Sequence, residues 1–246
     1  MFNNRGLDVR QFKNYKMTTE LTKIWHIDSI NLFEGLSYED KLKIEKLTVT
    51  HKHSKNEHIY FPEDSSTDVY FVTSGRVKIG KNSNNGKESI KSIVYEGEMF
   101  GEIGFVESEN QKKRRDFAQA MEDNTLVCVI SYENMQQIID MHPILNDKVI
   151  QKITQRLKRT EKRLESIMFK DARTRLVEFI KELAKDLGKP VGHEILVKHR
   201  LTHQEIANIT AISRQKVTTL LNELKNENLI HLERKSLLIR DINRLT

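Results

Sequence analysis

Hydrophobic and polar residues follow two different rhythms along the chain. Between residues 49 and 131, short β-branched and aromatic runs such as HIYF, VYFVTSGRVKIG and TLVCVI are separated by Pro62, Gly75 and Gly97. Short apolar runs bounded by turn residues are typical of strands. Several such strands at close spacing predict an antiparallel β-roll or barrel. Ahead of them, residues 18–48 carry apolar positions at helical spacing and predict short helices.

A long helix is predicted after the strands, from Pro143 to about Met168. Its apolar residues fall at alternating three- and four-residue steps, which is the heptad pattern of a coiled-coil seam with charged flanks. Thr160 occupies one seam position, where it costs stability and suits a specifying or sensing role. A helix this regular could pack on its own domain, but a narrow seam with charged flanks favours a parallel partner, and hence a homodimer. The predicted seam contains Ile150, Ile153, Leu157, Thr160, Leu164 and Ile167.

Two short helices joined by a tight turn are predicted within residues 201–221, after an amphipathic helix over 171–187 and a turn over 188–192. Thr202 and Glu205 have the spacing of a capping box. Residues 210–212 form the break between the two helices. An ordinary helical hairpin has the same pattern, but polar residues at the start of the second helix indicate a helix-turn-helix.

The second of these helices, capped by Ser213, has the chemistry for entering a DNA groove. Arg214, Gln215 and Thr218 lie near its start and point away from its apolar face. Arg pairs with guanine and Gln with adenine, whereas Ser213 and Lys216 suit phosphates. The following run NLIHLERKSLLIRD predicts a β-hairpin, or wing, with Arg and Lys at its tip.

Composition narrows the choice of partners and cofactors. Lys and Arg number 41 against 35 Asp and Glu, a net charge of +6 that is consistent with a polyanionic partner. The single cysteine, Cys128, sits in an apolar run as a small buried residue and cannot by itself hold an iron–sulfur cluster. No apolar run is long enough to cross a bilayer, so we expect a cytoplasmic protein without membrane contact. Residues 1–16 are expected to be a loose polar leader, with Met17 as a possible native start.

From about residue 25 to 242 the chain resembles the cyclic-AMP receptor protein (Crp/Fnr) family of bacterial regulators. The resemblance rests on IYFPEDSSTDVYFVTSGRVKI, on EGEMFGEIGF, on the seamed helix and on LTHQEIANITAISRQKVTTLLNEL, in the family's order. It implies an α+β fold in three parts. These are a cyclic-nucleotide-binding-like β-roll sensor over 18–142, a dimerisation helix over 143–170 and a winged helix-turn-helix DNA-binding domain over 171–246.

The resemblance also implies palindromic duplex DNA as partner, and RNA polymerase if the protein activates transcription. The family's frequent Ser-Arg-Glu-Thr-Val appears here as SRQKV, and Thr219 stands where Arg is common. Because Gln favours adenine where Glu accepts from cytosine, we expect a half-site that differs from the family's usual TGTGA type. Ala211 replaces the usual turn Gly, which implies mild strain or a shifted turn. The predicted DNA-binding residues are Thr202, Ser213, Arg214, Gln215, Lys216, Thr218 and Thr219.

The effector pocket departs further from the family pattern. Members that bind cyclic AMP hold its ribose with a Glu after a Gly and its phosphate with an Arg-Ser or Arg-Thr pair. Here the Gly-Glu is present, but the pair is Arg-Arg or Arg-Asp, without the hydroxyl and with Asp116 to repel a phosphate. These departures argue against cyclic AMP and leave another small molecule, or none. The candidate effector residues are Gly101, Glu102, Arg114, Arg115 and Thr160.

Two other classes of protein are compatible with parts of the sequence. His51, His53 and Glu57 have the spacing of a cupin metal site, which would make the chain a metal-dependent enzyme. Cupins also carry flanking glycines and a later histidine motif, which this chain lacks, so a polar strand face is the simpler interpretation. A ligand-binding module that docks on protein is the third class, and the basic second helix argues against it. We predict no catalytic residue and no metal site.

Overall fold

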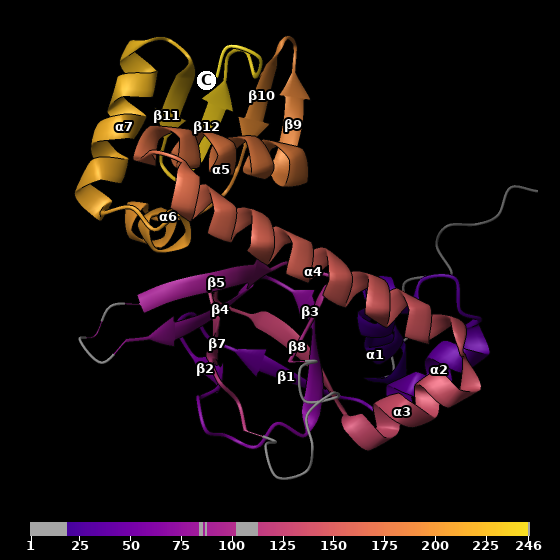
Figure 1. The fold of residues 1–246 in the computed structure, drawn as a ribbon. Coiled ribbons are helices and arrows are strands. Elements are labelled where there is room, and N and C mark those ends of the chain that lie inside the picture. The colour runs from indigo at the N-terminus through magenta and orange to yellow at the C-terminus, as the bar shows by residue number, and fades with distance from the viewer. Residues whose placement is uncertain (1–18, 84–85, 87, 102–112, 246) are drawn as a thin grey trace, which may run out of the picture. The chain divides into compact units, whose positions relative to one another are not determined.

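The computed structural model describes residues 19–83, 86, 88–101 and 113–245 (Figure 1). The described residues form two compact units, of which the first contains residues 19–77, 94–101, 113–114 and 119–146. The second contains residues 78–83, 86, 88–93, 115–118 and 147–245. In the described part of the chain, no helix is both long and apolar enough to span a membrane.

Short helices precede a set of strands, as the hydrophobic pattern predicts. Two four-stranded sheets result, with strand orders β1-β8-β3-β6 and β2-β7-β4-β5. In the first sheet β8 pairs antiparallel with both β1 and β3. The elements are α1 (Thr19–Asp28), the 3-10 helix η2 (Asn31–Phe33), α2 (Tyr38–Lys46), β1 (Val49–His53), β2 (His58–Tyr60), β3 (Asp68–Ser74), β4 (Val77–Asn82), β5 (Glu88–Val94), β6 (Met99–Phe100), β7 (Phe117–Ala120) and β8 (Thr125–Ser131).

The core of the first unit is built on strand β3, whose five central residues are all buried. Burial on both faces explains why this strand is a continuous apolar run instead of an alternating one. Phe71 packs against Phe33 with ring centroids 5.5 Å apart, and Tyr70 stacks on Phe100 at 5.1 Å. Cys128 in β8 is buried, and burial raises the pKa of its thiol to about 11. The thiol is therefore protonated and unreactive at neutral pH.

Two helices follow the strands, α3 (Tyr132–Met141) and the 26-residue α4 (Ile144–Phe169). Ser131 caps α3 by accepting a hydrogen bond from the Asn134 backbone N–H at 3.2 Å. The long helix agrees with the predicted one to within a residue at either end. Its buried residues include Leu145 and Val149. Of the predicted seam residues on this helix, Ile153 is half-buried and the other five are exposed.

The C-terminal part of the second unit combines three helices with a four-stranded sheet of order β11-β12-β10-β9. Helices α5 and α7 pack on each other through apolar faces that include Leu176 and Ile180 on the first and Val217 and Leu221 on the second. The elements are α5 (Ala172–Leu187), β9 (Gly188–Val191), β10 (Glu194–Val197), α6 (His203–Thr210), α7 (Arg214–Asn226), β11 (Ile230–Glu233) and β12 (Ser236–Ile239).

The turn predicted over residues 188–192 is wrong, because most of that stretch is strand β9, paired with β10. Pro190 is compatible with the sheet because β9 is its edge strand, where a missing N–H costs little. Gly188 is extended, and a Cβ there would come within 2.7 Å of the Ile195 side chain. Only Gly192, with φ of 61°, adopts the left-handed conformation of a turn.

Candidate nucleic-acid interface

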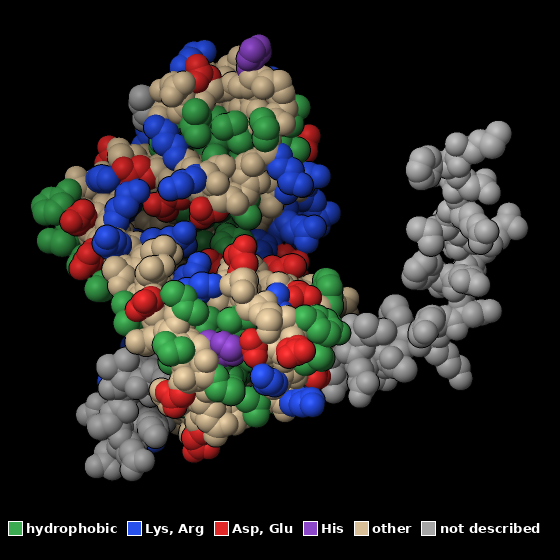
Figure 2. Space-filling model, turned by 90° about the vertical axis from the view of Figure 1, so that its right-hand side faces the viewer, with side chains coloured by type: hydrophobic (Ala, Val, Ile, Leu, Met, Phe, Trp, Pro, Cys, Tyr) green, Lys and Arg blue, Asp and Glu red, His purple; other side chains and the backbone are tan. Residues whose placement is uncertain are grey.

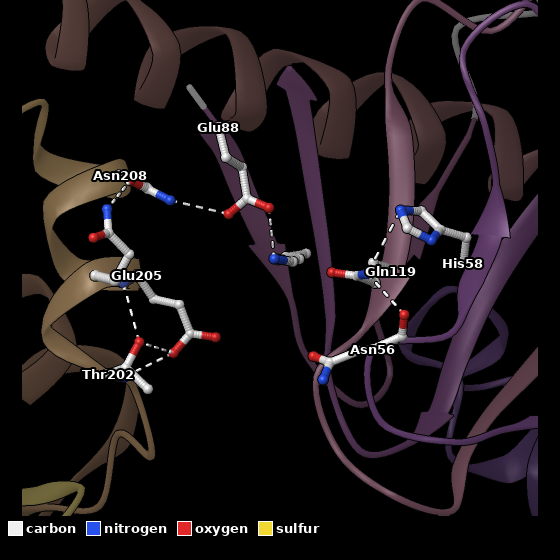
Figure 3. A network of polar contacts seen from close by, with 9 residues as sticks. Asn56, His58, Glu88, Gln119, Thr202, Glu205 and Asn208 are labelled. Atoms are coloured by element: carbon white, nitrogen blue, oxygen red, sulfur yellow. Dashed lines mark hydrogen bonds and ion pairs between the residues drawn. The ribbon is translucent and has the colours of Figure 1, made fainter. Parts of the chain in front are cut away.

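The first helix of the helix-turn-helix, α6, begins with the predicted capping box. The Thr202 hydroxyl accepts from the Glu205 backbone N–H at 3.2 Å, and the Glu205 carboxylate accepts from the Thr202 backbone N–H at 2.7 Å (Figure 3). This reciprocal pair satisfies two N–H groups that a helix start otherwise leaves unpaired. Thr202 is exposed but already occupied in the cap, so any DNA contact there would share its hydroxyl.

The turn between α6 and α7 is held by an arginine that the sequence pattern did not single out. Arg175 on α5 donates through Nε to the Thr210 carbonyl at 3.1 Å and through Nη2 to the Ala211 carbonyl at 3.2 Å. Its Nη1 donates to the Lys170 carbonyl at 2.9 Å. Carbonyls at a helix C-terminus lack partners within the helix, and a cation stabilises that end. Arg175 therefore fixes the angle at which α7 leaves the turn.

Ala211 adopts the left-handed conformation, with φ of 54° and ψ of 41°, at the end of α6. A residue with a Cβ is disfavoured in this conformation by about 1–2 kcal/mol, a cost that glycine avoids. Glycine also gives the unfolded chain more conformational freedom, which offsets part of this gain in stability. We expect Ala211→Gly to raise the free energy of unfolding of the DNA-binding part by about 0.5–1 kcal/mol. Chemical denaturation of the two proteins measures this difference.

The matched control for that substitution is Ala207→Gly, which places the same change inside α6, where the backbone is helical. A glycine in a helix interior costs about 0.5–1 kcal/mol. The two variants should therefore shift the unfolding midpoint in opposite directions. If Ala211→Gly destabilises the protein as well, the backbone at position 211 is not under the strain that its φ indicates.

Recognition helix α7 presents a row of exposed polar side chains at its N-terminus. Ser213 caps it by accepting from the Lys216 backbone N–H at 3.2 Å. Arg214, Gln215 and Lys216 are exposed, and none of the three makes a side-chain hydrogen bond to another described residue. The amide and guanidinium groups are thus available for base edges, and the ammonium group for a phosphate.

The two threonines of the predicted set that lie on α7 have their hydroxyls engaged within the protein. The Thr218 hydroxyl donates to the Arg214 carbonyl at 3.0 Å and lies 2.9 Å from Nδ1 of His203. Thr218 is half-buried, so His203 ties the start of α6 to the recognition helix through it. Thr219 is exposed, with its hydroxyl donating to the Gln215 carbonyl at 3.1 Å. Contacts of either threonine with DNA remain predictions.

The wing follows α7 as the sequence predicts. Strands β11 and β12 pair antiparallel from Ile230 opposite Ile239 to Glu233 opposite Ser236. The two residues of the connecting turn, Arg234 and Lys235, are exposed. Lys235 has a φ of 65°, the conformation that a tight hairpin turn requires. The tip thus carries two cations of the kind that bind phosphates.

The candidate effector residues are only partly brought together. Gly101 and Arg114 are in contact, with Arg114 Nη1 donating to the Gly101 carbonyl at 2.8 Å. Arg115 is exposed, and Glu102 lies outside the described residues. Thr160 is exposed on α4, where its hydroxyl donates to the Arg156 carbonyl at 2.9 Å. Whether these side chains share one ligand remains a prediction.

The three residues of the metal-site alternative lie on and just after β1. His51 is exposed, and Nδ1 of His53 lies 3.0 Å from the Glu57 carboxylate. This contact and a hydrogen bond from the Ser54 backbone N–H lower the pKa of Glu57, the backbone bond having the larger effect. Within the ranges that the structure describes, no group of three His, Cys, Asp or Glu side chains has the geometry of a metal site.

Net charge alone does not locate the DNA-binding surface. Figure 2 shows Asp and Glu side chains beside Lys and Arg on the face that it draws, so the charge of +6 is not one continuous positive field. The start of the recognition helix differs from that mixed surface because its exposed side chains are basic or amide groups. Two exposed cations, Arg214 and Lys216, flank Gln215 at the positive end of a 13-residue helix.

The C-terminal part of the chain contains a capped α6, a tight turn, an exposed recognition helix and a wing, and it follows a β-rich part in the sequence. These features define a winged helix-turn-helix DNA-binding regulator. Comparison with known proteins agrees. The cyclic nucleotide-binding domain family matches residues 50–142, and the Crp-like helix-turn-helix domain family matches residues 174–246. The chain belongs to the Crp/Fnr family of transcription regulators.

Individual relatives cover most of the chain. The CRP-like cAMP-activated global transcriptional regulator of Mycobacterium tuberculosis is 30% identical over 189 residues, which are 76% of this chain and 83% of the relative. The global nitrogen regulator of a Synechocystis strain is 28% identical over 183 residues, or 74% and 80% of the two chains. The structure of a mutant of CooA from Carboxydothermus hydrogenoformans matches with 28% identity and a TM-score of 0.72, over 86% of this chain and 90% of that one.

Proposed function

We propose that the protein is a homodimeric, sequence-specific transcription regulator that binds palindromic duplex DNA in the cytoplasm. The observation that carries this proposal is the row of exposed Arg214, Gln215 and Lys216 at the capped N-terminus of α7. Two such helices in one dimer would enter successive major grooves, about one DNA turn apart. Contact with RNA polymerase follows if the protein activates transcription.

The apolar stripe of α4 supports a second copy of the chain as partner. Large apolar side chains at heptad spacing are exposed on it in the single chain. Exposed apolar stripes of this regularity are costly in water and are covered when two helices pair. The stripe includes Ile150 at 52%, Leu157 at 56%, Leu164 at 58% and Ile167 at 42% exposure, with half-buried Ile153 and exposed Thr160 completing the seam.

The effector is proposed to be a small molecule other than cyclic AMP, or none. The Mycobacterium tuberculosis relative is cAMP-activated. In this chain the residue after Arg114 is Arg115 instead of a hydroxyl donor, and the buried carboxylate of Asp116 follows. A cyclic phosphate would lose a hydrogen bond worth about 1–3 kcal/mol. The Asp116 carboxylate itself is paired with Nζ of Lys91 at 2.6 Å. An effector would act by changing how the two α4 helices pack, and thereby how the recognition helices are spaced.

The metal-enzyme alternative receives no support from the arrangement of its three residues. His51 is exposed on β1, and His53 is turned toward Glu57 at 3.0 Å. The contact between His53 and Glu57 is not specific to a metal-binding enzyme, since side chains on a protein surface commonly pair in this way. The recognition helix and the relatives favour a regulator.

Selection of duplexes from a random pool by the ligand-free protein tests the proposal. We expect enrichment of a palindrome whose half-site is not of the TGTGA type, and affinity that falls steeply with salt, by about 0.9 log units per log unit of salt for each phosphate contact. The Arg214→Ala/Lys216→Ala double variant should enrich nothing. Enrichment of TGTGA half-sites would refute the predicted change in base preference, and failure to enrich any sequence with cyclic AMP and cell extract added would refute DNA binding.

A further inference from the structure

Arg114 is a buried cation that donates hydrogen bonds to the protein's own backbone. Only 4% of it is exposed. Its Nη1 donates to the Gly101 carbonyl at 2.8 Å and its Nη2 donates to the Asp68 carbonyl at 2.6 Å. The Asp68 carboxylate is not among these acceptors. Each terminal nitrogen of the guanidinium therefore donates one of its two N–H groups to a carbonyl, and the two carbonyls come from different parts of the β-roll.

Two tyrosine rings complete the environment of this guanidinium. Its central carbon lies 4.6 Å from the ring centroid of Tyr60 and 5.1 Å from that of Tyr70. A planar guanidinium over aromatic faces is a favourable cation–π arrangement, and more so where water is excluded. Burial raises the pKa of the Tyr70 hydroxyl, so this ring stays neutral. The rings balance part of the cost of burying a charge that has no anionic partner among the described residues.

The backbone around Arg114 is shaped to admit the guanidinium. Gly101 has a φ of 81°, and a Cβ built on it would lie 2.9 Å from Arg114 Nη1 and 2.8 Å from Tyr70 Cδ2. Only glycine leaves that space open. The Arg114 backbone is fixed as well, because its N–H donates to the Asp64 carbonyl and its carbonyl accepts from the Glu63 N–H, both at 2.8 Å.

The Gly101 carbonyl is a junction between this arginine and helix α3. It also accepts a hydrogen bond from the hydroxyl of Tyr132 at 2.6 Å. Tyr132 is the first residue of α3, and its backbone N–H donates to the Thr67 carbonyl at 2.9 Å. The guanidinium and the start of α3 thus hold the same carbonyl oxygen from two sides.

We propose that Arg114 is an internal brace: its guanidinium is committed to the Gly101 and Asp68 carbonyls and, with Tyr132, fastens the end of β6 to α3. The inference rests on the proposed function only in treating this unit as the sensor. Nε of Arg114, which has no hydrogen-bond partner among the described residues, is itself buried beside these contacts.

Thermal unfolding of the full chain tests the brace, with the neighbouring exposed arginine as a matched control. Arg114→Lys keeps the charge but cannot reach both carbonyls, and Arg114→Gln removes the charge. Both should lower the unfolding midpoint by roughly 5–10 °C. Arg115→Gln removes the same charge from the surface and should lower it by no more than about 1–2 °C. Equal, small shifts in all three variants would overturn the proposal.

The shared carbonyl gives a second measurement. Tyr132→Phe removes one hydrogen bond to the Gly101 carbonyl. If the two donors act through one carbonyl, the midpoint shifts of Arg114→Lys and Tyr132→Phe will not add in the double variant. Additive shifts would show that the arginine and the helix are held independently, against the proposal.

Anion titration of the unmodified protein remains decisive if Arg114→Gln does not fold. Cyclic AMP and inorganic phosphate, each added to several millimolar, should leave the unfolding midpoint unchanged. A rise in the wild type that persists in Arg115→Gln but disappears in Arg114→Lys would make Arg114 a ligand-binding residue and overturn the brace. None of these measurements involves DNA, so a failed duplex selection would refute the proposed function without touching this result.

Discussion

Arg214→Ala is expected to weaken binding of the selected palindrome by roughly 10²- to 10⁴-fold. A bidentate arginine–guanine pair discriminates by about 1–3 kcal/mol, and a dimer on a palindrome loses one pair at each half-site. Arg214 is exposed at the start of α7 and makes no side-chain hydrogen bond to another described residue, so its removal leaves the fold intact. Titration of labelled duplexes, one selected and one of random sequence, measures both affinities.

Lys216→Ala is the matched control, because Lys216 is exposed on the same turn of the same helix. A lysine that binds phosphate contributes equally to all sequences, so this variant should weaken both duplexes by a similar factor and flatten the salt dependence. Arg214→Ala should instead weaken the selected duplex far more than the random one. If both variants lower both affinities alike, Arg214 contacts the backbone and the base-reading assignment is wrong.

Local sequence signals identified most of the DNA-binding part. The capping box at Thr202 and Glu205, the Ser213 cap and the heptad steps of α4 depend on residues within a few positions of one another. Such signals are visible in the sequence because the spacing of the residues along the chain determines whether they interact. The left-handed Ala211 was also predictable, since a tight turn between two helices requires a residue with positive φ.

The contacts that sequence reasoning missed join residues far apart in the chain. Arg175 binds carbonyls 35 and 36 residues away, and Arg114 binds one 46 residues away. Nothing in the local sequence distinguishes these arginines from the many on the surface. Arg114 in particular stands in the basic run KKRR, which has the composition of a solvated loop, yet it is buried while Arg115 is not. Which of the two arginines is buried depends on the fold of the sheet and not on the local sequence.

Strand β9 was missed for a different reason. Gly, Pro and Gly within five residues are the usual composition of a turn. An edge strand tolerates both residue types, because one of its backbone edges needs no partner. The pairing of Leu196 with Lys189 and of Val197 with Gly188 is set by the apolar run of β10, which requires a neighbour on that side. Gly and Pro therefore do not mark the end of a strand where a neighbouring strand can pair with them.

The second large effect is expected from Leu157→Lys in the α4 seam. Leu157 is 56% exposed in the single chain, so the substitution should leave the fold of the monomer intact. In a parallel pair it would bring two ammonium groups together among Arg156, Lys158 and Arg159, and remove an apolar side chain worth about 1.5–3 kcal/mol from each copy. We expect the dimer dissociation constant to rise at least 10²-fold and palindrome binding to fall to that of a single half-site. Sedimentation and duplex titration measure the two effects.

Glu165→Lys is the control for this variant, because it introduces the same side chain at an exposed position of α4 outside the seam. It should remain dimeric and bind the palindrome with an affinity at least as high as that of the unmodified protein. Binding by the Leu157→Lys monomer should rise in parallel with protein concentration if the seam is the interface, since high concentration restores the pair. A Leu157→Lys protein that stays dimeric and binds normally would place the interface on another surface. Monomeric Leu157→Lys with unchanged palindrome affinity would instead show that each recognition helix binds its half-site alone.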